Sequence, residues 1–254
     1  MSFRIKYEII PDYIKINTKR RSGRKINEVK FAVIHDSGNP KSTSRNNVDY
    51  FKRTANEQSV SAHIFVDNKN IIECVPALTD KPEKAWHVLY DKPKDNQLFG
   101  ADANDAAIGI EYCYGNNINA DEAYKKLIWV CAYCAYYFNL NVEKCFTGHF
   151  ILDPGRKTDP KSGLAYSGRK YEQLLIDIKN EYYNCLNDES GDILDKFKDR
   201  ADVPEWAEDG LRFLVEKGII CGTDTGYLFP NKAITKAEQA TILYRVLKEF
   251  KIIE

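Results

Sequence analysis

Residues 29–38 read V-K-F-A-V-I-H-D-S-G and contain the strand around which the rest of the chain is expected to fold. Residues 29–34 form a short, almost continuous apolar run between polar segments, which is typical of a buried central strand. His35 follows this run directly. The sequence therefore predicts a central strand that delivers an imidazole to the edge of a sheet.

Further segments alternate between strand and helix patterns. Residues 63–67 and 71–75 flank a polar turn, which predicts a β-hairpin, and residues 106–114 form another strand that carries Glu111. Apolar residues at helical spacing predict helices at 45–55, 120–138 and 169–183. The alternation predicts an α/β domain with a mixed central β-sheet flanked by helices.

Residues 148–160, G-H-F-I-L-D-P-G-R-K-T-D-P, carry His149, Lys157 and Asp159. Proline and glycine predict an irregular loop here. If the loop folds back on itself, His149 and Asp159 can join His35 around one metal. Two histidines and one carboxylate form the three-ligand set of a catalytic zinc, whereas a structural zinc is usually closed by four protein ligands. The spacing alone is weak support, because loop ligands occur at many separations.

Five motifs occur in a distinctive order, each with one or more candidate site residues: F-A-V-I-H-D-S-G (His35), S-A-H-I-F-V-D (His63), A-W-H (Trp86, His87), A-I-G-I-E-Y-C-Y-G (Glu111) and the segment 148–160. In order and approximate spacing, residues 29–183 resemble the zinc-dependent N-acetylmuramoyl-L-alanine amidases. That family includes phage endolysins, wall-recycling amidases and peptidoglycan recognition proteins. The resemblance implies a mixed sheet with Zn²⁺ in a cleft at its edge.

The resemblance also implies hydrolysis of the amide between N-acetylmuramic acid and L-alanine, with Zn²⁺ held by His35, His149 and Asp159. Zinc would polarise the carbonyl and lower the pKa of its bound water to about 7. Burial in an apolar strand would raise the pKa of Glu111 into the range of a general base, and the alternative is an edge-strand glutamate facing solvent. Lys157 would stabilise the developing oxyanion, and the alternative is a surface lysine.

Three other residues are candidates for substrate binding. Trp86 would be a platform for sugar or peptide, and His87 would contact substrate. His63 would either contact substrate or support a metal ligand from behind. A hydrogen-bonded structural histidine is the alternative for His63 and for His87. Asp159 distinguishes catalysis from binding, because family members that bind peptidoglycan without cutting it typically lack the third zinc ligand. The sequence therefore favours an enzyme over a non-catalytic peptidoglycan-binding protein.

Composition restricts the partners. The 37 acidic and 37 basic residues give a net charge of zero, so nothing indicates nucleic acid or an anionic membrane surface. The seven cysteines are odd in number and lie mostly in apolar runs, which indicates reduced thiols. Cys131 and Cys134 form a C-x-x-C without a second pair, so we expect them, with Trp129, in a helix core. Residues 1–28 are polar and irregular, with a basic cluster expected to be solvated: Lys19, Arg20, Arg21, Arg24 and Lys25.

The C-terminal part has a different character. Residues 184–192 are polar and turn-rich, which predicts a linker between a catalytic domain at 1–183 and a module at 193–254. The pieces F-K-D, E-W-A, G-I-I-C-G, F-P-N and I-T-K-A-E resemble one S-layer homology repeat. Helices are expected at 205–217 and 235–250, the second with a capping box. The module is predicted to be a small helical hairpin.

Resemblance to this repeat implies binding of secondary cell-wall polysaccharide through Trp206 and Lys236. The repeat often has arginine where Lys236 stands, and lysine keeps the charge but loses the bidentate fork. Avidity in a homo-oligomer would offset weak binding by a single copy. The alternative is a packing or dimerisation hairpin, because the core is small.

These features together predict a phage-type endolysin that acts on peptidoglycan. The N-terminal residues lack the apolar core of a signal peptide, so we expect synthesis in the cytoplasm and release to the wall through a holin. The alternatives are a host autolysin or a recycling amidase that acts on soluble muropeptides. The wall-binding repeat disfavours the recycling enzyme.

Overall fold

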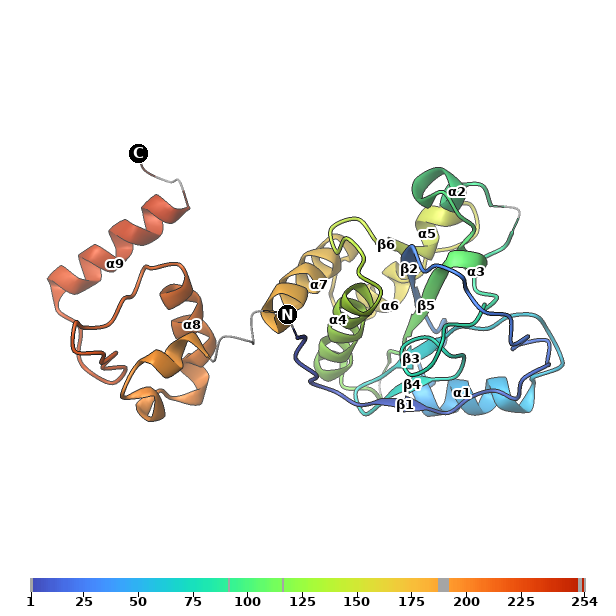
Figure 1. Ribbon diagram of the computed structural model, residues 1–254, viewed down its shortest axis with the longest axis horizontal. Helices are drawn as coiled ribbons and strands as arrows, with labels where there is room; N and C mark the ends of the chain where they lie inside the picture. The colour runs from blue at the N-terminus through green and yellow to red at the C-terminus, as the bar shows by residue number, and fades with distance from the viewer. Residues whose placement is uncertain (1, 91, 116, 187–191, 251–252, 254) are drawn as a thin grey trace. The chain divides into compact units, whose positions relative to one another are not determined.

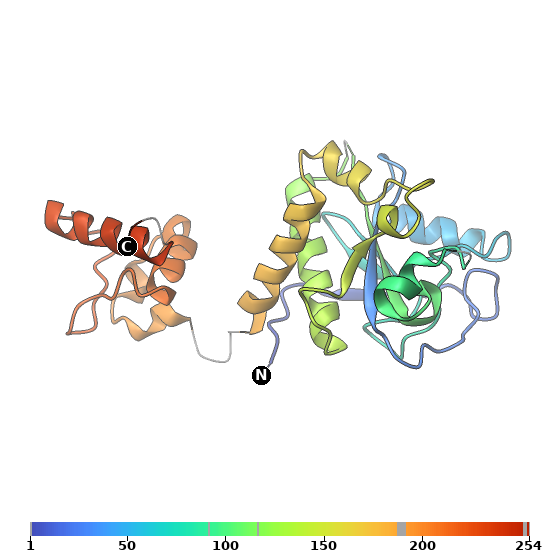
Figure 2. The ribbon, with the colours of Figure 1, turned by 90° about the horizontal axis from the view of Figure 1, so that it is seen from above.

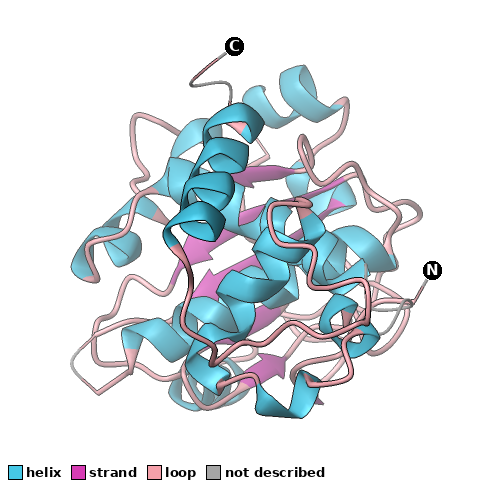
Figure 3. Cartoon of the chain, turned by 90° about the vertical axis from the view of Figure 1, so that its left-hand side faces the viewer, coloured by secondary structure: helices cyan, strands magenta, loops and turns pink. Residues whose placement is uncertain are grey.

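The computed structural model describes residues 2–90, 92–115, 117–186, 192–250 and 253 (Figure 1). Its contacts divide the chain into an N-terminal unit, residues 3–186, and a C-terminal unit that holds the described residues from 192 on. The six strands, magenta in Figure 3, all belong to the N-terminal unit. Every candidate for the amide chemistry therefore lies in one unit.

The N-terminal unit is built on a mixed sheet with the strand order β1-β4-β3-β5-β2-β6. Strands β3 and β4 form the predicted antiparallel hairpin, and the other neighbouring strands are parallel. The predicted α/β class is confirmed. The strands are β1 (Ile9–Pro11), β2 (Phe31–Asp36), β3 (Ile64–Val66), β4 (Ile71–Glu73), β5 (Ala107–Tyr112) and β6 (Phe146–Gly148).

Strand β2 is shifted relative to its prediction and includes His35. Successive side chains of a strand point to opposite faces. Ala32 and Ile34 enter the main core, against α4 (Ala120–Tyr137) and α7 (Tyr171–Leu186). These two helices pack side by side on one face of the sheet (Figures 1 and 2).

The opposite face of β2 has a smaller cover. Phe31 and Val33 pack there against Phe99, Ala103 and Leu152. His35 continues this side of the strand. The covering residues come from three short helices, α2 (Lys94–Phe99), α3 (Ala103–Ala106) and α5 (His149–Leu152). The candidate site therefore faces the thinly covered side of the sheet.

The remaining helices of the unit are α1 (Ser44–Arg53), which contacts β3 and β4, and α6 (Lys161–Tyr166).

Helix α7 runs through Leu186, so residues 184–186 are helical and their assignment to a linker was wrong. Cys185 is fully buried there, which anchors the last turn. Of the rest of the predicted linker, residues 187–191 lie outside the described residues, and Asp192 caps the first 3-10 turn of the C-terminal unit.

Residues 2–28 are more ordered than the polarity of the N-terminal segment suggested. Ile9–Pro11 adds β1 to the sheet edge, parallel to β4. Arg20 is fully buried, with its Nε donating to the Thr54 carbonyl at 3.1 Å and its guanidinium over the Phe51 ring. The expectation that the whole basic cluster is solvated was wrong, because these side chains have specific partners elsewhere in the fold.

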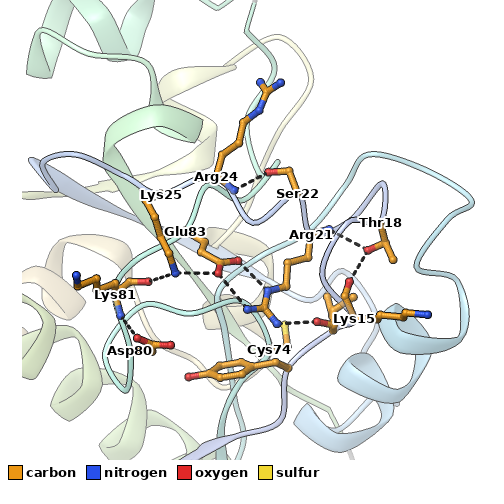
Figure 4. A network of polar contacts seen from close by, with 12 residues as sticks. Lys15, Thr18, Arg21, Ser22, Arg24, Lys25, Cys74, Asp80, Lys81 and Glu83 are labelled. Carbon is orange, nitrogen blue, oxygen red and sulfur yellow. Dashed lines mark hydrogen bonds and ion pairs between the residues drawn. The ribbon is translucent and has the colours of Figure 1, made fainter.

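Arg21 and Lys25 of the same cluster converge on one carboxylate (Figure 4). Arg21 binds Glu83 through two hydrogen bonds, Nε to Oε2 at 2.8 Å and Nη2 to Oε1 at 3.0 Å, and Lys25 Nζ reaches Oε1 at 3.0 Å. Glu83 is almost fully buried. The basic cluster therefore ties the N-terminal segment to the loop that precedes Trp86 and His87.

The C-terminal unit consists of helices and loops in its described residues. Helix α8 (Glu208–Glu216) follows three short 3-10 turns, η2 (Ile193–Lys196), η3 (Arg200–Asp202) and η4 (Glu205–Ala207). Helix α9 (Lys236–Glu249) begins at the predicted capping box, with Thr235 Oγ1 accepting from the Glu238 amide. Both predicted helices are confirmed, although the first turn of residues 205–217 is 3-10.

The cysteines match the expectation of buried thiols. Six are buried and Cys221 is exposed, and all seven are free. Cys131 and Cys134 lie in the core of α4 beside Trp129, which confirms the predicted helix core. Within the described residues, none of the helices combines the length and apolar character needed to cross a bilayer.

Candidate metal centre and cleft

Three adjacent parallel strands bring the candidate residues together. His35 in β2 is the register partner of Glu111 in β5, and Ile34 pairs with Gly148 of β6 on the other side. His149 directly follows β6 and begins α5. The carboxyl ends of parallel strands meet at one edge of a sheet, where α/β proteins commonly place their sites. This topology explains why residues far apart in sequence share one position.

Asp159 completes the cluster because its loop folds back. The Phe150 amide donates to the Asp159 carbonyl at 3.0 Å. Asp159 Oδ2 then lies 2.9 Å from His35 Nδ1 and 3.1 Å from His149 Nδ1. Ligand atoms of the three residues lie within 4.8 Å of one another. Two imidazoles and one carboxylate match the donor set of a catalytic zinc.

The segment 148–160 is less irregular than predicted. Gly148 ends a strand, and residues 149–152 form α5. Beyond it the Asp153 carbonyl accepts from the amides of Arg156 and Lys157, which forms a turn. The prolines and glycine correctly indicated a turn, but the short strand and helix on either side of His149 gave no periodic signal.

Burial and mutual contacts set the ionisation of the cluster. Burial lowers the pKa of His35 to about 4, against the opposing effect of its hydrogen bond to Asp159. Burial alone would raise the pKa of Asp159, but hydrogen bonds to His149 and His35 hold it well below its usual value. A neutral imidazole and an ionised carboxylate are the forms in which these groups bind metals.

Glu111 has no hydrogen-bond partner for its buried Oε2 among the described residues. Burial raises its pKa well above the usual value, the carboxylates of Asp159 and Asp36 raise it further, and Lys157 opposes them. Because β5 lies between β3 and β2, the alternative of an edge-strand glutamate is wrong. Lys157 is partly buried and lines a cleft together with Glu111, so the alternative that it is an ordinary surface lysine is disfavoured.

The cluster opens into a cleft with two lobes. A polar lobe of about 380 Å³ and an apolar lobe of about 280 Å³ share part of their walls. The shared residues are Val60, His87, His149, Arg156 and Lys157. The polar lobe is also lined by His35, Asp36, Asn47, Glu111, Asp159 and Ser162. The apolar lobe is also lined by Trp86, Val88, Leu89 and Tyr90. Both lobes therefore adjoin the predicted metal.

The structure separates the three predicted substrate-binding residues. Trp86 lines the apolar lobe and His87 lines both lobes. His63 is fully buried and lines neither, because its Nε2 bonds to the Glu83 carbonyl at 2.8 Å and its Nδ1 accepts from the Gly109 amide at 2.9 Å. The expectation that His63 contacts substrate was wrong, and its structural alternative is correct.

Asp36 is a residue of the site that sequence reasoning missed. Its Oδ2 accepts from Ser162 Oγ at 2.6 Å and from the Gly163 amide at 2.7 Å. It therefore fixes α6, which follows Asp159, to the end of β2. The signal was present in the H-D-S-G motif, where Asp36 directly follows the candidate ligand His35, but the residues that Asp36 binds lie more than a hundred positions away.

The C-terminal unit has its own groove of about 610 Å³. Its walls include Ile219, Leu228, Ile234, Ile242 and Arg245. Trp206 is 88% exposed and Lys236 is exposed, and neither lines this groove. The wall-binding role of these two residues stays a prediction.

Comparison with known proteins agrees with the two-part organisation. Residues 25–162 match a family described as N-acetylmuramoyl-L-alanine amidase, and residues 196–240 match the S-layer homology domain. The N-acetylmuramoyl-L-alanine amidase CwlL of Bacillus licheniformis is 31% identical over 110 residues, which are 42% of this chain and 29% of that protein. The S-layer protein sap of Bacillus anthracis is 44% identical over 48 residues, or 18% of this chain and 6% of that protein.

A solved structure shares the fold. The mutant endolysin from Bacillus subtilis superimposes with a TM-score of 0.54 at 21% identity, covering 68% of this chain and 99% of that chain. The chain spans less than a third of the length of the first curated relatives it matches. The fold similarity covers about two thirds of this chain and nearly all of the solved structure.

Proposed function

The chain belongs to the N-acetylmuramoyl-L-alanine amidase family, and from that premise we propose that its N-terminal unit hydrolyses the amide between N-acetylmuramic acid and L-alanine in peptidoglycan. The observation that carries this proposal is the convergence of His35, His149 and Asp159 beside Glu111 in one cleft. Zinc is the cofactor that this donor set favours. When bound, it polarises the substrate carbonyl and lowers the pKa of water.

Two side chains of the protein carry out the other steps of the reaction. Glu111, with its raised pKa, accepts a proton from the attacking water and returns it to the nitrogen of the departing L-alanine. Lys157 lines both lobes and places a positive charge where negative charge develops on the carbonyl oxygen. The scissile bond then lies where the polar and apolar lobes meet, with Trp86 available for stacking.

We propose that the C-terminal unit directs this chemistry to intact cell walls. Its support is the match to the S-layer homology domain, together with an apolar groove that carries Arg245. Binding of wall polysaccharide would hold the N-terminal unit near its insoluble substrate. An endolysin that acts at the wall after release from the cytoplasm fits this arrangement better than an enzyme for soluble muropeptides.

The test combines metal content with product analysis on purified peptidoglycan. We expect wild type to carry one Zn²⁺ per chain and to free L-alanine amino groups. Asp159→Ala should lose both, whereas Glu111→Gln should keep zinc and lose activity by about 10²- to 10⁴-fold. New reducing sugar ends without free L-alanine would instead mean that the unit cuts glycan. Metal-free protein that still binds walls would leave a recognition module.

A further inference from the structure

His87 contacts the side of His35 that faces away from Asp159. The distance from His87 Nδ1 to His35 Nε2 is 3.0 Å, and the two rings are nearly perpendicular, at 85°. His35 Nδ1 lies 2.9 Å from Asp159 Oδ2 at the same time. Both nitrogens of the His35 ring therefore have a partner: Nδ1 contacts Asp159, and Nε2 contacts His87.

A hydrogen bond between two ring nitrogens needs one donor and one acceptor. If Nδ1 of a neutral His35 gives its lone pair to a metal, its proton must be on Nε2. His87 Nδ1 is then the acceptor, and the proton of His87 is on its own Nε2. That Nε2 atom is buried and forms no hydrogen bond of standard geometry with the described residues, so the contact with His35 decides the tautomer of His87.

The fold holds His87 by its main chain. Asn104 of α3 is almost fully buried, and its Oδ1 accepts from the amides of His87 at 2.9 Å and Val88 at 3.1 Å. Its Nδ2 donates to the Val88 carbonyl at 2.6 Å. Three hydrogen bonds from one side chain fix the segment that carries the His87 ring.

The His87 ring packs against the sheet at Gly109, where the strand has no side chain. A Cβ atom at Gly109 would lie 2.9 Å from both Cγ and Nδ1 of His87, closer than side chains tolerate. The Gly109 amide is bound by His63 Nδ1, and the His63 ring lies 5.6 Å from that of His87. His63, Gly109 and Asn104 together therefore fix the position of the His87 ring.

We propose that His87 is a positioning residue, which accepts the Nε2 proton of His35 and so directs Nδ1 of His35 to the metal. This inference rests on the zinc site of the proposed function. It differs from the role expected from sequence, because His87 acts through a ligand and not through contact with substrate. Groups that orient a ligating histidine in this way typically contribute 10- to 100-fold to metal affinity.

A matched pair of variants tests the acceptor. His87→Leu removes it at similar size, and His87→Asn places an oxygen close to the position of Nδ1. Zinc affinity is measured by competition with a chromogenic chelator, and thermal melting of the metal-free proteins controls for folding. We expect the leucine variant to bind zinc about 10- to 100-fold more weakly and the asparagine variant to recover most of that loss. Equal affinity in wild type and His87→Leu, or equal losses in both variants, would overturn the proposal.

Nitrogen-15 NMR of the histidines in wild type gives a second readout that needs no variant. In the zinc-loaded protein, we expect His35 and His87 both to carry their protons on Nε2. A proton on Nδ1 of His87 in that state would contradict the proposal. Neither experiment uses peptidoglycan, so zinc binding with the expected order but without wall cleavage would refute the amidase function and leave His87 in its role. A wild type that binds no zinc would overturn the inference itself.

Discussion

The two units of this chain use similar helices but bury them very differently. In the N-terminal unit, helices α4 and α7 contribute fully buried residues such as Trp129, Leu127 and Leu174 to one large core. In the C-terminal unit, α9 buries none of its residues, and the core is a small cluster of Leu194, Phe197, Val203 and Val215. A local signal such as a capping box is therefore enough to start a helix, but not to attach it firmly.

This difference matches the work proposed for each unit. Metal chemistry needs ligands held to within a fraction of an ångström. In the N-terminal unit the three candidate ligands are His35 in the central strand β2, His149 directly after β6, and Asp159 on a loop that folds back onto them. The C-terminal unit instead exposes large apolar side chains, including Phe229, Ile234 and Leu243. Three variants test how strongly each unit depends on its buried contacts.

The largest effect is expected from Glu83→Gln in the N-terminal unit. The change leaves Arg21 and Lys25 without their shared carboxylate. Lys25 is half exposed, but the Arg21–Glu83 pair is buried, and removing one partner from a buried ion pair costs about 4 kcal/mol. We expect this loss in the free energy of unfolding, measured by urea denaturation. Glu28→Gln is the matched control, because its pair with Lys30 is exposed. Equal stability of the two variants would mean that the N-terminal segment is not tied down by this network.

The same network predicts a pH dependence. Burial alone would raise the pKa of Glu83, but hydrogen bonds from Arg21 and Lys25 hold it below its usual value. The unfolded carboxyl binds protons first as pH falls, so this stabilisation is complete above about pH 4.3 and is lost as pH drops through the lower folded pKa. The acid limb of the stability curve should be steeper in wild type than in Glu83→Gln.

Leu194→Ala should have a smaller effect, confined to the C-terminal unit. Leu194 is fully buried in the small core, and truncation of such a residue costs about 3 kcal/mol. We expect wall binding to be lost at lower temperature while zinc affinity is unchanged. Sedimentation with purified cell walls over a range of temperatures measures the first, and a zinc titration measures the second. A parallel loss of zinc would show that the units are energetically coupled.

The smallest effect is expected from Thr235→Ala, which removes one half of the capping box of α9. Loss of such a cap costs about 1 kcal/mol. Because α9 has no buried residue to compensate, we expect a lower melting temperature of the C-terminal unit. Thr235→Ser keeps the acceptor and serves as the control. An unchanged melting temperature in Thr235→Ala would mean that contacts outside the cap stabilise α9.

Much of the N-terminal unit was predictable because its signals are local. Apolar runs identified β2 and β5, and helical spacing identified α4 and α7 to within a few residues. Strands β1 and β6 were missed because three residues are too few for a periodic pattern. The same limit hid the short helix at His149.

The sequence by itself determined the α/β class and the capping box of Thr235 and Glu238, because periodicity and local hydrogen bonds depend on residues that are close together in the chain. It also nominated His35, His149 and Asp159 as a donor set, and the structure brings these three side chains together. Only the tertiary structure decided which side chains meet. Arg21 reaches Glu83 across 62 positions and His87 reaches His35 across 52. These pairings depend on strand order and on the room left at Gly109. For that reason His63 and His87, equal candidates in sequence, have different places: His63 is a buried structural residue, and His87 contacts His35 of the candidate metal site.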